Sequence, residues 1–367
     1  MDKCYRLRPS VSFVPIDSQE GRYDFFLTNT RRTVPFKFAE PRLIEVVLRL
    51  NGMHTLKQIM EEVGNDLEEK IVALLDYLVS RCIVEEMESA RERESHPFRR
   101  VMNFLGDYIP GHELHNVWHR IQECRIILIG LGAMGSWVAT LLAESGFTHY
   151  TLVDSDRVDR SNLNRSLFNE RDIELPKTLV MKRRLKAMNP EIDVKEIAVV
   201  LDDVEQMHLI LDGIDVKNAL VINCADFPNV DVTSRIISQV CMDLEIPYII
   251  AGGYNLHLSL LGPTCIPYHS ACYECMRLTL DEINSPELKN IRKLARPNRN
   301  IGNLAPLTGI SASFVVNEAL RVAAKDNSLA PAMLNRRGEY NFLNNKINFI
   351  ELPRRSDCSW CSEIKRK

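Results

Sequence analysis

The sequence predicts an α/β protein with a doubly wound, mainly parallel sheet, preceded by a small α+β domain. Two observations carry this prediction. Between residues 125 and 251, short apolar runs alternate with helical segments, an order typical of parallel strands joined by crossover helices. The first run is followed at once by Gly130, Gly132 and Gly135, the spacing with which a Rossmann-like strand turns into its helix.

Length and composition narrow the possible classes of protein. At 367 residues the chain is long enough for two or more domains. Its 46 basic and 49 acidic residues give a net charge of −3, which offers no general attraction to nucleic acid or to an anionic membrane. No apolar run approaches the roughly 20 residues that span a bilayer, and no signal-peptide core is evident. We therefore expect a cytoplasmic protein that binds neither nucleic acid nor membrane.

Residues 1–87 are expected to form a winged-helix-like domain in which short strands precede three helices and a closing strand. The strand-like runs are residues 11–14, 23–27, 33–38 and 82–84. The first helix should open at Pro41 and end near Gly52. The next two should open with the capping boxes Thr55–Gln58 and Asp66–Glu69. The third helix should bury one apolar face, formed by Ile71, Leu74, Leu75 and Leu78.

The charge of this domain argues against DNA binding. Residues 41–86 contain five Lys or Arg and nine Asp or Glu, and this excess of acid would repel a phosphate backbone. A peptide-binding or dimerising role fits better. A bound peptide would add as a strand to the exposed edge near residues 23–38.

Residues 88–121 are expected to connect the two domains. Residues 88–100 are highly charged and contain the break His96-Pro97, so they predict a linker, and residues 114–121 predict a helix. The main domain should then span residues 122–367. Its parallel strands are predicted at residues 126–129, 150–153, 194–198, 220–224 and 248–251.

Beyond Gly252-Gly253 the pattern changes. We expect hairpin-like strands near residues 256–261, a polar loop at 281–303 and a long apolar helix at 304–324. A final pair of strands is predicted at residues 339–343 and 346–351.

The glycine turn and the following strand predict a nucleotide site. Gly130, Gly132 and Gly135 allow a tight turn and close approach to phosphate, while the helix beginning near Met134 offers its positive end to the anion. Asp154, nineteen residues beyond the last glycine, ends the next strand and can accept the ribose hydroxyls. The alternative is a glycine-rich turn without a ligand.

Four polar residues beyond Asp154 favour ATP over a dinucleotide. Asn162, Arg165 and Lys177 suit a triphosphate under attack, because negative charge builds up on the α-phosphate and on the departing pyrophosphate. Asp226 follows a predicted strand at the ligand-binding end of the sheet and suits Mg²⁺. We expect Arg165, Lys177 and Asp226 to be catalytic. Alternatively, Arg165 and Lys177 form surface ion pairs and Asp226 caps a helix.

Two CxxC pairs predict a metal centre. Cys272 with Cys275, and Cys358 with Cys361, supply four thiolates, enough for a closed tetrahedral zinc shell. The two pairs have 82 residues between them, so the ion would be a structural clip that ties the C-terminal segment to the domain. A redox pair of the thioredoxin type is the alternative, and disulfides are less compatible with the expected compartment.

The order of these motifs over about residues 115–363 resembles the ThiF/MoeB/MccB superfamily of adenylating enzymes. The resemblance implies that Gly130, Gly132 and Gly135 line the nucleotide and that Asp154 binds ribose. It also implies that Asn162, Arg165 and Lys177 contact phosphates, that Asp226 positions Mg²⁺, and that the four cysteines bind structural zinc. Such enzymes are usually homodimers in which an arginine of the partner reaches ATP, a role for which Arg99 or Arg100 is the candidate.

Two departures narrow the expected substrate. The loop at residues 281–303 contains no cysteine, and Cys224, Cys241 and Cys265 lie in or beside apolar runs, so thioester relay to a ubiquitin-like protein is disfavoured. Residues 1–87 resemble PqqD-like domains, which bind the leaders of ribosomally made precursor peptides. Together these features imply an enzyme of peptide antibiotic biosynthesis that activates a carboxylate of such a peptide, for example a Glu side chain, as an acyl-adenylate and so promotes cyclisation with loss of water.

Other functions remain open at this point. One is an adenylyltransferase acting on the C-terminus of a ubiquitin-like sulfur carrier or of a peptide. Another is a non-catalytic presenter of leader peptides to a separate cyclase, and an NAD dehydrogenase is the least favoured. Contact with the core peptide is a hypothesis for five residues that also fit a solvated charge run: His257, Arg292, Lys293, Arg296 and Arg299.

Overall fold

The computed structural model describes residues 2–251, 254–255, 258–288 and 302–361. The chain forms two compact units, Met1–His119 and Arg120–Lys367. Within the described ranges, no helix is both long and apolar enough to cross a bilayer.

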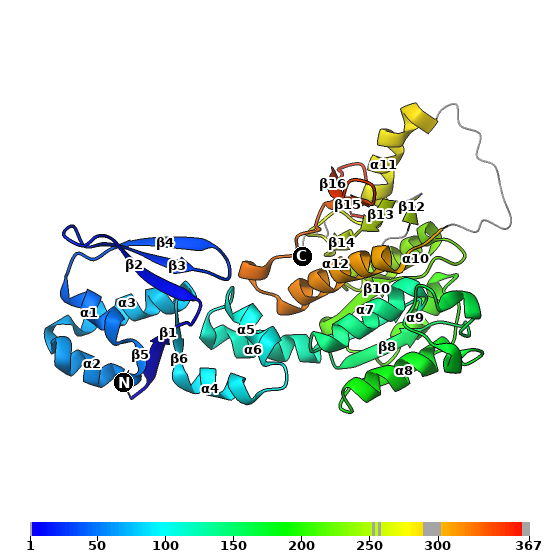
Figure 1. The fold of residues 1–367 in the computed structure, drawn as a ribbon. Helices are drawn as coiled ribbons and strands as arrows, with labels where there is room; N and C mark the ends of the chain where they lie inside the picture. Colours follow the sequence, from blue (N-terminus) through cyan, green and yellow to red (C-terminus); the bar gives the residue numbers. More distant parts are fainter. Residues whose placement is uncertain (1, 252–253, 256–257, 289–301, 362–367) are drawn as a thin grey trace. The chain divides into compact units, whose positions relative to one another are not determined.

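The first unit contains two small antiparallel sheets and a layer of helices (Figure 1). The sheets have the strand orders β2–β3–β4 and β5–β1–β6. The strands are β1 (Cys4–Leu7), β2 (Val11–Asp17), β3 (Arg22–Leu27), β4 (Arg32–Lys37), β5 (Asn51–Thr55) and β6 (Val84–Glu86). The helices are α1 (Arg42–Arg49), α2 (Leu56–Val63) and α3 (Glu68–Ser80). The first three predicted strands are confirmed as β2, β3 and β4, whereas β1 and β5 were not predicted.

One apolar core joins the β2–β3–β4 sheet to the helices. Phe25 and Leu27 of β3 are buried in the same cluster as the side chains of α3. The predicted apolar face of α3 is confirmed, because Ile71, Leu74, Leu75 and Leu78 are all buried. Burying each such side chain stabilises the unit by about 1.5–3 kcal/mol, so this core holds the sheet against α3.

The two capping predictions have different outcomes. Thr55 and Gln58 form the predicted capping box, with reciprocal bonds of 3.2 and 2.9 Å between side chain and backbone. The prediction that Asp66 caps the third helix is wrong. Asp66 lies in a short 3₁₀ turn, and its carboxylate accepts two bonds from the Arg42 guanidinium, at 3.1 and 2.9 Å. A bidentate, charge-assisted pair thus replaces the cap.

Residues 88–100, predicted as a linker, are mostly helical. Helix α4 (Met87–Ser95) and helix α5 (Arg99–Gly106) occupy this stretch, and α6 (Gly111–Glu123) confirms the predicted helix that follows. The buried Arg93 of α4 donates to Glu85 of β6 at 2.5 Å and to Asn103 of α5 at 2.9 Å. These tertiary contacts override the polar composition that favoured a linker.

The second unit is built on a six-stranded sheet with the order β14–β11–β10–β7–β8–β9. The five parallel strands, all predicted, are β7 (Arg125–Ile129), β8 (His149–Val153), β9 (Asp193–Ile197), β10 (Ala219–Asn223) and β11 (Tyr248–Ile250). The edge strand β14 (Thr264–Cys265) pairs antiparallel with β11. Strands β7, β10 and β11 are almost continuously apolar, as expected where a sheet is covered on both faces, whereas β9 at the edge contains Asp193, Lys195 and Glu196.

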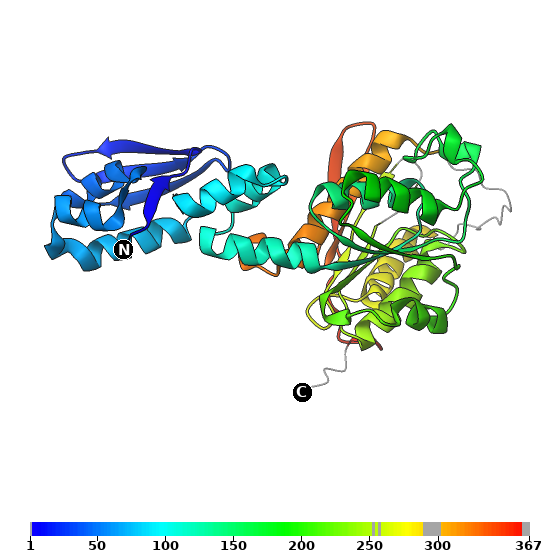
Figure 2. The same ribbon diagram turned by 90° about the horizontal axis from the view of Figure 1, so that it is seen from below.

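Helices cover both faces of this sheet, as Figure 2 shows. On one side lie α7 (Ala133–Glu144), α8 (Lys177–Met188) and α12 (Ala305–Ala324). On the other lie α9 (Val204–Leu211) and α10 (Val230–Asp243). The predicted doubly wound fold and the long apolar helix are confirmed.

A smaller antiparallel sheet with the order β12–β13–β15–β16 completes the unit. Its strands are β12 (Tyr254–Asn255), β13 (Leu258–Leu261), β15 (Arg336–Asn341) and β16 (Lys346–Glu351). Helix α11 (Tyr273–Leu288) precedes α12. It extends through residues 281–288, so the prediction of a loop from residue 281 is wrong for this stretch, and residues 289–301 lie outside the described ranges.

Candidate functional site

The three glycines of the turn after β7 have different reasons to be glycine. Gly130 has a φ of +89°, and a Cβ there would lie 2.6 Å from the Ala225 nitrogen. A Cβ on Gly135 would lie 1.9 Å from the Gly130 carbonyl oxygen. Gly132, which precedes the first residue of α7, would meet nothing within 4 Å. Packing therefore requires Gly130 and Gly135, while the space beside Gly132 is open to a ligand.

Asp154 follows β8 directly, at the carboxyl end of the sheet beside this turn. Its carboxylate accepts the Leu131 N–H at 2.6 Å and the Asp156 N–H at 2.8 Å. Burial raises the pKa of Asp154, and the charge of Lys177 opposes this shift only in part. Each carboxylate oxygen has a second lone pair, so the fixed carboxylate can still accept hydroxyl groups.

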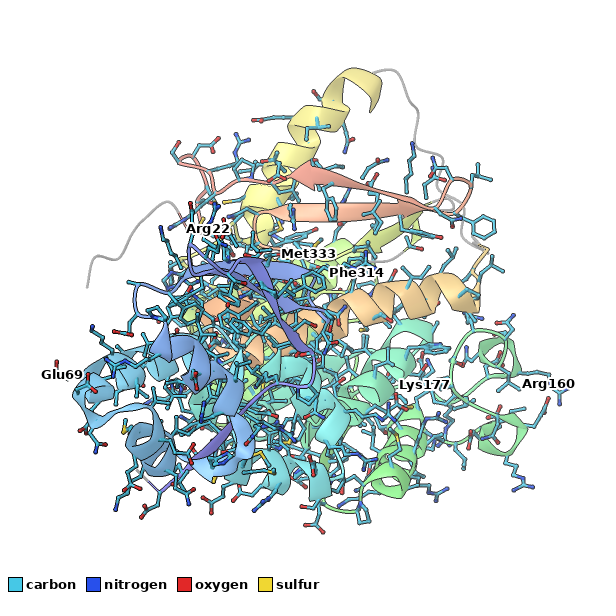
Figure 3. All side chains as sticks on the ribbon, turned by 60° about the vertical axis from the view of Figure 1, so that its left-hand side comes forward. Arg22, Glu69, Arg160, Lys177, Phe314 and Met333 are labelled. Carbon is cyan, nitrogen blue, oxygen red and sulfur yellow. The ribbon has the colours of Figure 1, made fainter. Side chains whose placement is uncertain are left out.

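Lys177 is the first residue of α8, and its side chain is buried. The ammonium donates to Asp156 at 2.7 Å and lies 3.9 Å from the Asp154 carboxylate. The side chain of Arg160, on the loop before α8, is by contrast 77% exposed. Both residues are labelled in Figure 3. The alternative, that Lys177 forms a surface ion pair, describes only its contact with Asp156. Asp156 is exposed, whereas the side chains of Lys177 and Asp154 are largely buried.

Asn162 and Arg165 lie on the loop between β8 and α8. The Asn162 side chain accepts the Asp159 N–H at 3.0 Å and thereby closes a short 3₁₀ turn, Arg160–Asn162. The Arg165 guanidinium donates to the Ser161 carbonyl and, at 3.1 Å, to the Asn164 side chain. Among the described residues, its hydrogen bonds are thus with its own loop and not with Lys177.

Asp226 is exposed on the loop that follows β10. The buried Asn223 anchors this loop, because its amide donates to Thr233 and Ser234 at 3.0 Å each and accepts the Ala225 N–H at 3.1 Å. Ala225 is also the residue that packs against Gly130. The glycine turn, Asp154 and the Asp226 loop therefore meet at the carboxyl ends of β7, β8 and β10, where open α/β sheets bind ligands.

Sequence reasoning missed the anchoring residues of this site. Asn223 and Asp156 lie close in sequence to Asp226 and Asp154, but their bonds depend on tertiary packing. The signal for Asp156 was its position two residues after Asp154, on the same side of the strand end. His257 and the basic residues of the loop, Arg292, Lys293, Arg296 and Arg299, lie outside the described residues.

The four predicted zinc ligands are gathered in one place. Cys272, Cys275, Cys358 and Cys361 are buried, and their sulfur atoms all lie within 4.8 Å of one another. The closest sulfur pairs are separated by 3.2, 3.5 and 3.8 Å. Four ligands at about 2.3 Å from a tetrahedral zinc ion lie roughly 3.8 Å apart, so the donor set fits zinc. All four are free thiols and not disulfides.

The metal site connects the start of α11 to the C-terminal segment. Cys272 and Cys275 flank the start of α11, while Cys358 and Cys361 follow β16. The Arg355 N–H donates to the Cys275 sulfur at 3.4 Å, and Arg354 donates to the Cys361 carbonyl at 2.5 Å. These contacts suit a structural clip and not a catalytic centre.

Comparison with known proteins agrees with this geometry. The model of the ThiF family matches residues 113–360. The sulfur carrier protein ThiS adenylyltransferase of Escherichia coli is 27% identical over 248 residues, which cover 66% of this chain and 87% of that protein. Ubiquitin-like modifier-activating enzyme 5 of rice is 22% identical over 332 residues, which cover 87% of this chain and 74% of that protein.

Two solved structures share the fold. That of E. coli MccB with ATP has a TM-score of 0.69 and 22% identity, covering 97% of this chain and 99% of that one. That of PaaA has a TM-score of 0.61 and 18% identity, covering 82% and 97%. From the family match over most of the second unit and the adenylyltransferase relatives, it follows that this chain belongs to the ThiF family and is an adenylating enzyme of the ThiF/MoeB type.

Proposed function

We propose that the protein binds the leader of a ribosomally made precursor peptide and adenylates a carboxylate of that peptide with ATP, which leads to cyclisation with loss of water. One observation carries the choice of a peptide. The fold match to MccB covers 97% of this chain, so it includes the first unit as well as the ThiF region. One MccB structure is described as a microcin C7 biosynthetic enzyme in complex with N-formylated MccA.

In this proposal the second unit binds and orients ATP. The N–H groups of the turn around Gly132 and the start of α7 would face the phosphates, and Asp154 would accept the ribose hydroxyls. Lys177 and Arg165 would stabilise the charge that develops on the phosphates. Asp226 would hold Mg²⁺, whose charge would help to neutralise the triphosphate.

The chemical step is an exchange of bonds at the α-phosphate. A carboxylate oxygen of the peptide forms a bond to the α-phosphorus, and the bond from that phosphorus to the bridging oxygen of pyrophosphate breaks. The acyl-adenylate then loses AMP when an internal nucleophile of the peptide attacks the acyl carbon. Holding the peptide next to the nucleotide supplies much of the rate enhancement, because it makes the attack intramolecular.

In the same proposal the first unit holds the leader. Strand β4 is at the edge of its sheet and, among the described residues, pairs only with β3. The predicted region, residues 23–38, includes both strands, but only β4 has a free side for an added strand. Pro35 lies within β4, and proline within a sheet is tolerated at an edge. Backbone pairing to β4 would give affinity, and side-chain contacts would give specificity.

The test is pyrophosphate exchange into ATP with the precursor peptide encoded beside the gene. Full-length peptide should support exchange, whereas the core peptide without its leader should support little. A peptide-independent background, or an absence of exchange with the cognate peptide, would contradict the proposal.

The sulfur-carrier relative favours a second candidate, adenylation of the C-terminus of a ubiquitin-like protein. The same assay distinguishes the two candidates. If the second is right, exchange should require the carrier protein and should be indifferent to the leader peptide. A non-catalytic presenter would support exchange with neither, and Asp226→Ala would leave its function intact.

A homodimer, with Arg99 or Arg100 of α5 reaching the nucleotide of the partner, remains part of the proposal. Both side chains are exposed.

A further inference from the structure

The loop that carries Asn162 and Arg165 is attached to α7, the helix that follows the glycine turn. The indole N–H of Trp137 donates to the Arg165 carbonyl oxygen at 3.0 Å. The hydroxyl of its neighbour Ser136, which is fully buried, accepts the Leu167 N–H at 3.2 Å. Two successive residues of one helix therefore bind the backbone on either side of residue 166.

A third attachment comes from α8. Arg184 donates to the hydroxyl of Thr140, one turn further along α7, at 3.3 Å and to the Leu167 carbonyl at 3.4 Å. The backbone of the loop is thus held where it passes α7, although its outer residues, such as Arg160, are exposed.

The side chain of Arg165 is less committed than its backbone. Within the described part of the chain, its guanidinium hydrogen-bonds only to its own loop, through Ser161 and Asn164. To bind a phosphate, the guanidinium would have to leave these contacts. A long side chain on a mobile backbone loses more conformational freedom on binding than one on a fixed backbone, so a fixed backbone favours the new contact.

We propose that Trp137 is a positioning residue for the adenylation reaction. Its indole N–H fixes the backbone of Arg165 relative to the phosphate-binding end of α7, so that the guanidinium reaches the phosphates of ATP from a fixed pivot. This inference rests on the proposed role of Arg165 as a phosphate ligand. Trp137 belongs to none of the motifs found in the sequence, and its effect on phosphate binding is assigned to a single ring N–H.

Two substitutions separate this N–H from the bulk of the ring. Trp137→Phe keeps an aromatic ring but removes the donor. Trp137→His restores a donor, because Nε2 of histidine stands at the same bond count from Cβ as Nε1 of tryptophan and carries a proton in the imidazolium and in one neutral tautomer. Arg165→Ala and the double variant Trp137→Phe/Arg165→Ala complete a cycle that measures whether the two residues act together.

The experiment measures binding of MgATP and of adenosine to each full-length variant by calorimetry, together with its melting temperature. Loss of one hydrogen bond should weaken MgATP binding by about 3- to 10-fold in Trp137→Phe. Adenosine, which has no phosphate, should bind as it does to the wild type. The histidine variant should recover to within about twofold of the wild type, and Trp137→Phe should have no further effect once Arg165 is alanine.

Three results would overturn the inference: unchanged MgATP binding by Trp137→Phe, equal weakening of adenosine and MgATP, or independent effects in the double variant. The second would indicate a general structural role. Because no peptide is present, these outcomes do not depend on the acceptor. A wild type that binds MgATP but shows no peptide-dependent exchange would count against the proposed function and leave the role of Trp137 to be judged by the binding data.

Discussion

At the residue scale, the site is organised around a buried carboxylate whose charge is only partly compensated. Asp154 accepts two backbone N–H groups, yet burial still raises its pKa because Lys177 lies 3.9 Å away and is bonded to Asp156 instead. A raised pKa for a carboxyl group means that its protonated form is favoured in the folded protein. Ionised Asp154 thus costs stability at neutral pH, and that cost disappears as the pH falls below its raised pKa.

Ribose binding should share this pH dependence. Adenosine should bind well when Asp154 is ionised, and its affinity should fall with decreasing pH at a midpoint above the ordinary aspartate value of about 3.9. Titration calorimetry with adenosine tests this without interference from phosphate groups. In Asp154→Asn the affinity should be weaker and should lack this acid limb. A midpoint at or below the ordinary value in the wild type would show that burial does not control this group.

The glycines allow a matched comparison. Gly132→Ala adds a methyl group to open space at an ordinary φ of −68°, so the melting temperature should change little while MgATP binding weakens. Gly135→Ala places a Cβ 1.9 Å from a carbonyl oxygen and should destabilise the unit by about 1–3 kcal/mol or more. Thermal unfolding and nucleotide binding of both variants check this. Undiminished MgATP binding by Gly132→Ala would mean that no ligand approaches this residue.

At the element scale, a buried ionic cluster attaches helices α4 and α5 to the sheet β5–β1–β6. Glu85 of β6 is 4% exposed and contacts three arginines: Arg6 at 2.8 Å, Arg8 at 4.0 Å and Arg93 at 2.5 Å. Burial alone would raise the pKa of Glu85, but the positive charges of Arg8, Arg93 and Arg6 outweigh it and hold the pKa below its usual range. The carboxylate therefore stabilises the unit above the ordinary glutamate pKa, and this stabilisation is lost as the pH falls through the depressed value.

Glu85→Gln should consequently destabilise the first unit strongly. Removing one partner of a buried ion pair costs about 3–5 kcal/mol, because buried guanidinium groups are left uncompensated. The control is Glu62→Gln, which breaks an exposed pair with Arg49 and should cost about 0–1 kcal/mol. Denaturant unfolding near pH 7 tests both variants. Equal effects would show that the cluster is not a stabilising element.

The zinc clip gives a second element-scale prediction. Metal analysis of purified protein should find one zinc ion per chain, and Cys358→Ser should lose it and lower the melting temperature. Cys4→Ser is the control, because Cys4 lies in the first unit and is not part of the cluster. Zinc retained in Cys358→Ser would contradict the assignment of all four ligands.

Elements also show what sequence can predict. Most of the parallel strands were predictable because they are buried apolar runs between turn residues, a local property, although β9 is a more polar edge strand. Helices α4 and α5 were not, because Arg93 lies in a highly charged stretch and its burial depends on Glu85 from another element. The glycines and Asp154 were identifiable because a nucleotide site imposes fixed spacings on the chain. Trp137 and Asn223 were not, since hydrogen bonds to groups that only the fold brings close leave no mark in the sequence.

At the scale of the whole molecule, the chain combines an adenylating unit of the ThiF family with a preceding unit in which, among the residues described, the outer edge of β4 pairs with no strand. In the proposed function, this edge selects the substrate and the second unit performs the chemistry. Substitutions that block the edge should raise the KM for the peptide and leave MgATP binding unchanged. Thr33→Pro in β4 is suitable, since a second proline removes a backbone donor. A change in MgATP affinity, or an unchanged KM, would argue against separate roles.

The central claim is that a peptide carboxylate attacks the α-phosphorus of ATP. The most direct measurement follows oxygen from a precursor peptide whose carboxyl groups are labelled with ¹⁸O. During cyclisation, we expect one ¹⁸O atom in the AMP released and none in pyrophosphate. Appearance of the label in inorganic phosphate, with ADP as the nucleotide product, would contradict it and would assign the activation to the γ-phosphate.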